Sequence, residues 1–530
     1  MRDALILEAA EHFGTPLYLY DADVLRHTYR RLRGLLHPRV DVFYSLKANP
    51  NISVCALLRA EGAGAEVCSP AELRTALDAG VAPENIIYLG PAKDASQLRA
   101  CVRAGIHAVV CESFDELALL EGIAAEAGRT VDAMLRINPA RRAPGSALTM
   151  GGKPRQFGID AAEVAEAGGV LRGLRHVRVM GLHAFLGSRF LDHEAIIHNT
   201  REVLRLADEL AAVLGHPLET VDFGGGFGVA YFDNETDLDV EALAAGLGEA
   251  VEPYAAAHPD CRLITELGRY LVADAGLYVT RAVSVKDSLG ETFVVCDGGT
   301  NHHMHAVGIG QLVKRNFPVR LLSPHEPDAP RRPYTVTGPL CTPNDLLAKR
   351  IPLPRVRAGD LIGIERSGAY GPTASPVHFL GFGAPAEVLV LDGRPRLVRA
   401  RDSVEGMLSR QRLVVPVPTD HTATPAPTST STSTSTSTSG ENMQRTEIIA
   451  ALRSGIGAVT GRQVAELTED TRLFDDLDLD STSMLELLVE IEEALHVQVD
   501  PDELDIVDLQ TVGTLTDLFA RRSETPAPAC

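Results

Sequence analysis

Apolar positions in the first half of the chain follow two alternating patterns. Short runs rich in β-branched and aromatic residues are each followed by a stretch in which apolar residues recur at helical spacing. Clear helical stretches are residues 94–105, 113–128 and 194–215. The strand-like runs are residues 40–49, 64–69, 85–90, 108–113, 132–139, 179–188, 220–228 and 262–269. Eight strands separated by helices predict a (β/α)8 barrel over residues 21–269, with a doubly wound sheet as the alternative.

From about residue 270 the pattern changes to short alternating runs with Gly and Pro turns, such as YTVTGPLCTPNDLL and AGDLIGIERSGAYG. This pattern predicts a β-rich domain over residues 270–416. The N-terminal segment, residues 1–20, contains the run TPLYLYD, which we expect to pair into that domain.

A Thr, Ser and Pro tract over residues 417–442 cannot bury apolar surface and is predicted to be a linker. Beyond it, residues 443–522 contain RTEIIAALRSGIGAV, DSTSMLELLVEIEEAL, ELDIVDL and TVGTLTDLFARR, which predict an all-α domain of four helices. Residues 523–530 are expected to form a disordered tail. The second helical segment has apolar residues at helical spacing: Met484, Leu485, Leu488, Ile491 and Leu495.

The net charge of −21 is concentrated at the C-terminal end. Residues 443–520 hold 18 Asp and Glu against four Arg, a net charge of −14. Such a surface argues against nucleic-acid binding and favours a partner with a basic face. The eight cysteines form no CxxC pair, and no apolar run reaches membrane-spanning length. These features predict a cytoplasmic protein with reduced thiols and no membrane partner.

Candidate chemistry lies where the strand-like runs end. Lys47 in FYSLKANPN offers an amine that can form a Schiff base with an aldehyde, although a strand-end lysine is more often merely solvated. The glycines of DFGGGFG, residues 222–228, can present backbone N–H groups to an anion or form a tight turn. Glu266 and Arg269 in ELGR can hold a ring nitrogen and a phosphate, or form a surface ion pair.

Together these motifs resemble the fold-type III pyridoxal-phosphate (PLP) decarboxylases, which act on ornithine, diaminopimelate and arginine, over about residues 15–410. The resemblance implies that Lys47 carries the cofactor and that Glu266 keeps its ring nitrogen protonated, so that the ring accepts electrons when CO2 leaves. It implies a cofactor site made of Lys47, Glu66, Arg136, His183, Phe185, Ser188, Gly225, Gly226, Glu266, Gly268, Arg269 and Tyr370.

The same resemblance implies a homodimer with shared active sites. Cys341 in GPLCTPND would reach in from the second subunit as the proton donor, with Asp345 beside it.

Two positions depart from the family pattern. Where the family stacks a histidine on the cofactor ring, this chain has Phe185, two residues after His183. Thr342 stands where the family has the acid that binds the distal amine of a diamino acid. A dibasic substrate is therefore disfavoured, because its second ammonium would lack a partner.

Three histidines in NHHMHA (His302, His303 and His305) resemble a metal site only in composition. No Cys or carboxylate set accompanies them at metal-ligand spacing, so no metal is expected.

The C-terminal helical domain resembles an acyl carrier protein, with an Asp-Ser pair at the start of its second helix and Glu486 five residues on. Ser481 would then carry 4′-phosphopantetheine, added by a phosphopantetheinyl transferase. Thr482 replaces a leucine that often follows this serine, and Asp480 with Ser481 can also be read as simple helix caps.

A PLP decarboxylase needs a free α-amine and a free α-carboxylate on its substrate. An amino acid tethered to Ser481 must therefore be held by its side-chain carboxyl, γ-glutamyl first and β-aspartyl next. GPLCTPND and the Phe185 pattern are similar to the L-glutamyl-[acyl-carrier-protein] decarboxylases of butirosin-type antibiotic pathways. That similarity implies an amino-acid:carrier-protein ligase and a downstream acyl or aminoacyl transferase as partners.

Three other hypotheses remain: a decarboxylase of free amino acids whose product is loaded later, an amino-acid racemase, and a silent barrel that only supports the carrier. Glu266 argues against the racemase, because racemases of this type place an arginine on the ring nitrogen.

Overall fold

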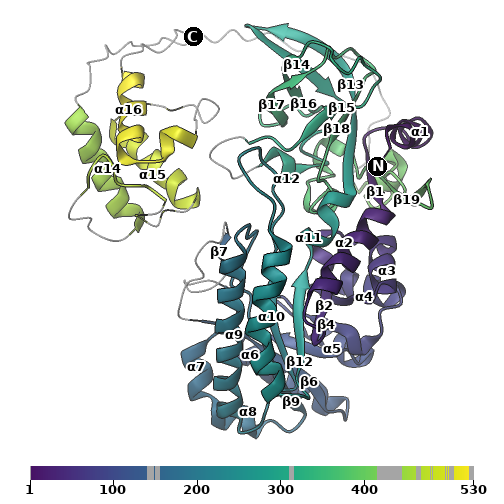
Figure 1. The fold of residues 1–530 in the computed structure, drawn as a ribbon, viewed down its shortest axis with the longest axis vertical. Helices are drawn as coiled ribbons and strands as arrows, with labels where there is room; N and C mark the ends of the chain where they lie inside the picture. The colour runs from purple at the N-terminus through teal and green to yellow at the C-terminus, as the bar shows by residue number, and fades with distance from the viewer. Residues whose placement is uncertain are drawn as a thin grey trace. The chain divides into compact units, whose positions relative to one another are not determined.

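The computed structural model describes residues 2–139, 148–149, 156–308, 315–414, 445–460, 467–474, 476–477, 479, 481–495, 497, 499 and 506–523 (Figure 1). The chain forms two compact units, one of residues 1–307 and 316–407 and one that contains the C-terminal helices. The predicted linker over 417–442 and residues 524–530 of the predicted tail lie outside the described residues.

Eight parallel strands form the first sheet of the larger unit. They are β2 (Val40–Ser45), β3 (Gly64–Val67), β4 (Ile86–Tyr88), β5 (Ala108–Cys111), β6 (Val131–Asn138), β9 (Val177–His183), β11 (Thr220–Gly225) and β12 (Arg262–Leu267). The sheet closes on itself because β12 pairs with β2 and β5 pairs with β6. The predicted (β/α)8 barrel is therefore confirmed, and the doubly wound sheet is excluded.

Helices lie outside the strands (Figure 1). They are α2 (Ala22–Leu35), α3 (Ile52–Ala60), α4 (Pro70–Asp78), α5 (Ala95–Ala104), α6 (Phe114–Glu126), α7 (Ala161–Glu166), α8 (Gly168–Gly173), α9 (His193–Leu214) and α10 (Val240–Ala257). Most begin at a residue whose side chain accepts a hydrogen bond from the first turn, such as Ser69, Asp94 and Ser113. These caps help to define where those helices begin.

A compact apolar cluster fills the barrel interior, formed by Phe43, Ile87, Leu89, Ala108, Val110, Met134 and Ile264. The size of Phe43 is matched by a glycine on the neighbouring strand. A Cβ at Gly64 would lie 2.6 Å from the Phe43 ring, so only glycine fits there.

His107 lies at the start of β5, with Nε2 2.9 Å from Thr220 Oγ1 at the start of β11. Burial, with the nearby charge of Arg262, lowers the pKa of His107 to about 4. The unfolded chain takes up this proton near pH 6.5, whereas the folded chain does not, so His107 reduces stability as the pH falls from about 6.5 to about 4.

We expect His107→Gln to make the stability of the protein depend less on pH. Glutamine can keep the hydrogen bond to Thr220 but does not titrate. Between about pH 7.5 and about pH 5, the wild type should lose about 1–2 kcal/mol more unfolding free energy than the variant in urea titrations. Equal losses in the two proteins would contradict the expectation.

The second sheet of the larger unit forms the β-rich domain. Its strands are β1 (Leu17–Asp21), β13 (Gly276–Ser288), β14 (Glu291–Cys296), β15 (Val319–Leu321), β16 (Arg332–Thr337), β17 (Leu346–Leu353), β18 (Leu361–Ile364), β19 (Ala386–Leu391) and β20 (Arg394–Arg399). The N-terminal strand β1 lies inside this sheet, antiparallel to β13 and parallel to β19. Helix α1 (Asp3–Phe13) buries Ile6 and Ala9 in the apolar cluster that also contains strand residues Leu17, Val279 and Val388.

Short elements complete the larger unit: β7 (Leu148–Thr149), β8 (Ile159–Asp160), β10 (Gly187–Ser188), α11 (Arg269–Val272), α12 (Met304–Val307) and, near its end, α13 (Val404–Leu408).

The C-terminal unit contains α14 (Arg445–Thr460), α15 (Ser481–Leu495), a 3-10 turn at Ile506–Leu509 and α16 (Val512–Ser523). The predicted segment ELDIVDL is thus described only as that short turn. Along α15, Met484, Leu488 and Ile491 are buried as predicted, and Leu487 joins them. The Leu485 side chain lies outside the described residues. Glu486 and Glu490 are exposed, which leaves an acidic face on this helix.

Several strands end earlier than the sequence predicts. Strand β2 stops at Ser45, and Lys47 lies in the 3-10 turn Leu46–Ala48 that follows. Strand β9 stops at His183 rather than at residue 188. The reason is that the segments beyond these ends bond to other parts of the chain, as when Ala48 O accepts a hydrogen bond from Tyr370 N. Lys47 therefore lies on a turn just outside the barrel, whereas Glu266 lies on strand β12.

Within the described residues, no helix combines the length and the apolar composition that crossing a membrane requires.

Candidate active site

A cavity lies where the barrel strands end. It is lined by Ser45, Lys47, Phe185, Ser188, Gly226, Phe227, Glu266, Leu267, Gly268, Arg269 and Tyr370. Eight of these residues were predicted from sequence as cofactor-binding. Ser45, Phe227 and Leu267 were not, because an apolar or small residue beside a motif has no chemical signature of its own.

Lys47 is 40% exposed, and its Nζ lies 3.3 Å from Oε2 of the fully buried Glu66. Withdrawal from solvent lowers the pKa of Lys47, but the carboxylates of Glu66 and Glu266 outweigh it, so the pKa lies above its ordinary value. Cys68 donates to the other Glu66 oxygen at 2.8 Å. The resting amine is therefore an ammonium that lines the cavity and is paired with the Glu66 carboxylate.

The turn that carries Lys47 is held by the β-rich domain. Tyr370 N donates to Ala48 O at 2.7 Å, and Asn49 Nδ2 donates to Gly368 O at 3.0 Å. Tyr370 adopts a φ of 55°, which is unusual for a residue other than glycine. Such a conformation persists only where surrounding contacts impose it, and here it brings the Tyr370 ring into the pocket.

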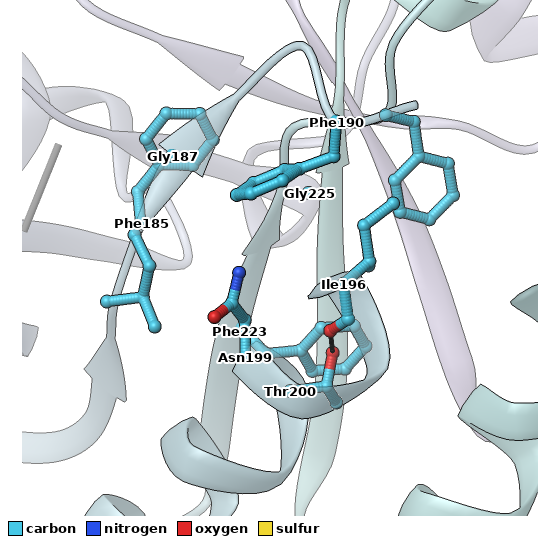
Figure 2. Close-up of a pocket in the computed structure, with 10 residues that line it drawn as sticks. Phe185, Gly187, Phe190, Ile196, Asn199, Thr200, Phe223 and Gly225 are labelled. Carbon is cyan, nitrogen blue, oxygen red and sulfur yellow. Dashed lines mark hydrogen bonds between the residues drawn. The ribbon is translucent and has the colours of Figure 1, made fainter. Parts of the chain in front are cut away.

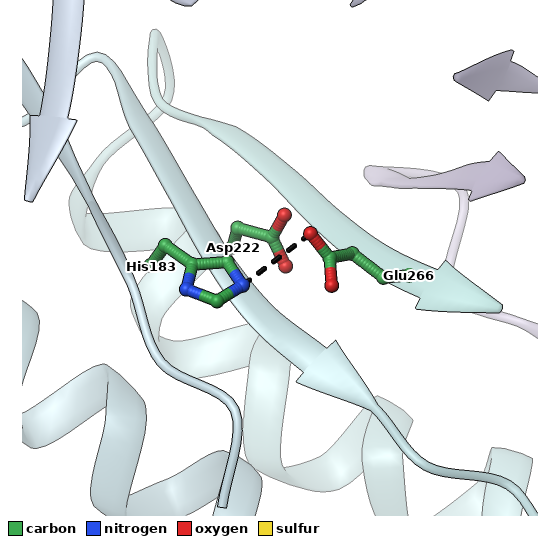
Figure 3. Close-up of side chains that lie close together, drawn as sticks. All are labelled: His183, Asp222 and Glu266. Carbon is green, nitrogen blue, oxygen red and sulfur yellow. Dashed lines mark ion pairs between the residues drawn. The ribbon is translucent and has the colours of Figure 1, made fainter. Parts of the chain in front are cut away.

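Three buried polar side chains lie close together at the cavity residue Glu266: His183, Asp222 and Glu266 itself (Figure 3). The parallel register places Asp222 beside His183 on neighbouring strands, and Gly225 beside Glu266 on the next pair. His183 Nε2 lies 3.3 Å from Glu266 Oε1, and Asp222 Oδ1 accepts from Gly224 N at 2.8 Å. Only Glu266 of the three lines the cavity.

The carboxyl groups of Asp222 and Glu266 have opposite protonation states. Burial alone would raise the pKa of Glu266, but His183, Lys47 and Asp222 lower it below its ordinary value. Burial and then repulsion from Glu266 raise the pKa of Asp222 well above its usual range. Two neighbouring buried carboxyls cannot both ionise, so Asp222 keeps its proton and Glu266 carries the charge.

The glycine tract after β11 packs too closely for side chains. A Cβ at Gly225 would lie 2.0 Å from Glu266 O, and one at Gly226 would lie 2.4 Å from Gly187 O. Gly226 also has a φ of 78°. Bare backbone therefore faces the cavity next to Ser188, which suits an anion.

Phe185 lines both this cavity and a second, smaller hollow, which is drawn in Figure 2. The Lys47 ammonium lies 5.5 Å from the centroid of the Phe185 ring. Gly224 packs against the ring, because a Cβ there would be 2.9 Å from its Cδ2. Phe185 is thus a fixed aromatic wall of the cavity, and behind it the unpartnered amide of buried Asn199 points into the hollow.

The structure does not bring Arg136 into the cavity. Its guanidinium pairs with Glu112 at 2.9 Å and stacks on Phe157, with both charged groups buried. Glu112 comes directly after β5, which pairs with the Arg136 strand β6, so no local sequence pattern indicates this ion pair. Arg136 thus supports the rim formed by β5 and β6 in this structure.

The loop GPLCTPND lies between β16 and β17, and its residues do not line the cavity. Cys341 is exposed. Asp345 is buried, and its two oxygens accept from Thr300 N at 2.6 Å and Leu340 N at 2.7 Å. Within one protomer Asp345 therefore holds this loop, and contact of Cys341, Thr342 and Asp345 with substrate stays a prediction.

The histidines of NHHMHA have separate partners. His302 Nε2 lies 3.0 Å from Gly383 O, and His303 Nε2 lies 2.8 Å from Ser367 Oγ. His305 Nε2 lies 3.1 Å from Arg269 Nη1. The motif is thus part of the packing between the two sheets, and His305 reaches the edge of the cavity.

The residues present fit PLP. Arg269 Nε is buried with no partner, which leaves a donor for phosphate beside the glycine tract. Glu266 lines the cavity, and its carboxylate could face a protonated ring nitrogen, while Lys47 would supply the amine for the aldehyde. Ser188 and Tyr370 also line the cavity and would complete the phosphate end, and Phe185 would offer a ring face. Bound here, PLP supplies a ring that accepts the electron pair released when a carboxylate departs.

In the C-terminal unit, Ser481 is the first residue of α15, and Asp480 lies outside the described residues. A serine at a helix start, followed by the exposed Glu486, has the position expected of a phosphopantetheine attachment site.

Comparison with known proteins gives two family matches. Residues 22–273 match the pyridoxal-binding domain of pyridoxal-dependent decarboxylases, and residues 450–519 match the phosphopantetheine attachment site. Among individual proteins, the chain is 37% identical over 412 residues to the L-glutamyl-[BtrI acyl-carrier protein] decarboxylase of Niallia circulans. That alignment covers 77% of this chain and 96% of the relative.

Other relatives are diaminopimelate decarboxylases. The enzyme of Zymomonas mobilis is 31% identical over 429 residues, covering 78% of this chain and 96% of the relative. A crystal structure of the Helicobacter pylori enzyme complexed with L-lysine is 30% identical, with a TM-score of 0.69 over 76% of this chain and 98% of the other. The protein therefore belongs to the fold-type III PLP-dependent decarboxylases and carries a phosphopantetheine attachment domain in the same chain.

Proposed function

We propose that this enzyme decarboxylates an amino acid tethered through its side-chain carboxyl to the phosphopantetheine of Ser481. The observation that carries the proposal is the presence of the Lys47 cavity and a carrier domain in one chain. The leading substrate is a γ-glutamyl thioester, which would become a 4-aminobutyryl thioester. A β-aspartyl thioester, yielding β-alanyl, is the next candidate.

The chemistry of the cavity restricts how the substrate is tethered. Lys47 can hand the cofactor only to a free α-amine, and the α-carboxylate must be free to leave. A thioester through the α-carboxyl would block decarboxylation. The side-chain carboxyl is therefore the point of attachment.

Two positions support a substrate without a second ammonium group. Thr342 supplies no negative charge in the GPLCTPND loop, and the Lys47 cavity is closed on one side by the apolar ring of Phe185. A relative that shares 37% identity is named for a glutamyl-carrier substrate. These features favour a neutral thioester over a distal amine.

The assembly proposed for this function is a homodimer in which Cys341 of one subunit acts at the cavity of the other, as the exposure of Cys341 in the protomer allows. A phosphopantetheinyl transferase, an amino-acid:carrier-protein ligase and a downstream acyl or aminoacyl transferase would serve Ser481 in the cytoplasm. The product would then enter the biosynthesis of a secondary metabolite, of the antibiotic type.

The second candidate is a decarboxylase of free amino acids whose product is loaded afterwards. The identity of 31% to a diaminopimelate decarboxylase favours it. This candidate predicts that a Ser481→Ala variant still decarboxylates free amino acid. The tethered reaction predicts no such turnover.

The test is to charge the pantetheine-bearing protein with glutamate, using a ligase, and to weigh the Ser481 peptide. We expect the peptide to lose the mass of one CO2, while free glutamate and free diaminopimelate stay unchanged. The Ser481→Ala variant should neither charge nor convert. An unchanged peptide mass would contradict the glutamyl substrate, and turnover of free amino acid would favour the second candidate.

A further inference from the structure

Arg269 is held on one edge and free on the other. Its Nη1 donates to Tyr231 OH at 3.0 Å and lies 3.1 Å from His305 Nε2. Nη1 carries two hydrogens, so these two acceptors use both of them. Nε is buried with no partner, and no carboxylate among the described residues pairs with this guanidinium. The Nε–Nη2 edge is therefore the one available to an anion.

Aromatic rings hold the imidazole of His305 in place. The rings of Tyr231, Phe317 and Tyr370 lie edge-on to it, with centroids 5.1, 5.1 and 5.7 Å away. Phe317 also stacks on Tyr231 at 4.3 Å. The guanidinium of Arg269 in turn lies 4.6 Å from the Tyr370 ring centroid. Packing of this kind leaves the imidazole little freedom to rotate.

His305 can accept a hydrogen bond from Arg269 only while it is neutral. Burial, then the charges of Arg269 and Arg189, lowers the pKa of His305 to about 3. The other groups that face this cluster are Tyr231, Tyr370 and Glu235, and Glu235 pairs with Arg189 at 2.7 Å. The ring is therefore an acceptor throughout the pH range in which most proteins work.

We propose that His305 and Tyr231 are positioning residues that fix Arg269, so that its Nε–Nη2 edge receives the cofactor phosphate. Arg269 lies on α11 at the end of the barrel, whereas His305 lies on α12 after the β-rich strand β14. Capture of the phosphate thus depends on α12 being packed against the barrel. This inference rests on the proposed PLP site but not on the identity of the tethered amino acid.

The test compares two cofactor forms on the full-length chain after cofactor removal: PLP, and pyridoxal, which lacks the phosphate. Binding is read from visible absorbance, and inorganic phosphate is added as a competitor. His305→Leu should lower the ratio of PLP affinity to pyridoxal affinity about tenfold, because Arg269 loses one of its two fixed contacts. It should also weaken competition by phosphate.

His305→Gln should restore most of the ratio, because the glutamine Oε1 can accept the same hydrogen bond. Tyr231→Phe should lower the ratio in the same direction, since the ring stays and only the acceptor is lost. His302→Gln is the matched control: His302 is a buried histidine of the same motif that contacts Gly383 O instead, and its variant should leave the ratio unchanged.

An unchanged ratio of PLP affinity to pyridoxal affinity in His305→Leu would overturn the proposal. Equal loss of affinity for the two cofactor forms would do the same, because a general loss of structure lowers both affinities. The Ser481 peptide assay separates this outcome from failure of the proposed substrate. If wild type binds PLP but leaves the glutamyl peptide unchanged, the substrate proposal fails and the Arg269 test remains decisive.

Discussion

Lys47→Ala is expected to abolish conversion of the tethered amino acid and to remove the visible absorbance band of the bound cofactor. Lys47 is the only lysine among the residues that line the cavity, so nothing else there can bind the aldehyde covalently. The rate should fall by at least about 10⁴-fold, as when a covalent catalyst is removed from other enzymes. The measurements are an absorbance spectrum of the purified protein and the mass of the Ser481 peptide.

Two variants make the Lys47 result specific. Lys47→Arg keeps a cation beside Glu66 but cannot form the covalent bond, so it should behave like Lys47→Ala. Lys286→Ala removes an exposed lysine on β13 and should leave both readings unchanged. If the absorbance band survived in Lys47→Ala, the assignment of the cofactor lysine would be incorrect.

Glu266→Gln and Asp222→Asn are expected to have very different effects although the two residues are neighbours. Glu266 carries the charge, and its amide variant removes the anion that would face the cofactor ring nitrogen. Turnover should then fall about 10³-fold, while the cofactor stays bound through Lys47 and Arg269. Asp222 already holds a proton, so asparagine imitates its native state and should keep most of the activity.

Single-turnover rates on charged protein, with cofactor content measured in parallel, test this pair. The lowered pKa of Glu266 also predicts that an acid limb of the pH profile near neutrality arises from another group. If Asp222→Asn lowered the single-turnover rate as much as Glu266→Gln, the assignment of the proton to Asp222 would be wrong. Asp222→Ala is not equivalent, because it also removes the contact with Gly224 N.

The positions of the barrel strands could be predicted because each is a run of neighbouring residues. The run around FYSLKAN predicted a strand followed by a reactive lysine, and DFGGGFG predicted backbone exposed to an anion. Both features depend on local composition and spacing, which are properties of adjacent residues. The prediction that the strand reaches Lys47 was wrong, because the hydrogen bond from Tyr370 N to Ala48 O comes from a distant segment.

Other parts of the site depend on contacts that no local pattern contains. The sequence predicted Arg136 at the cofactor and Asp345 at the substrate, but the structure gives them Glu112 and the backbone of Thr300 as partners. His305 was considered only as a metal ligand, and its contact with Arg269 exists because α12 packs beside α11.

The sequence by itself determined the (β/α)8 barrel, the β-rich domain, the carrier helices and the types of reactive group, because periodicity and residue chemistry are set by nearby residues. Only the tertiary structure decided which of those groups meet and what charge each one carries. Pairing of the neighbouring strands β9, β11 and β12 brings His183, Asp222 and Glu266 together in a buried space, and burial with charge repulsion then protonates one carboxyl and ionises the other.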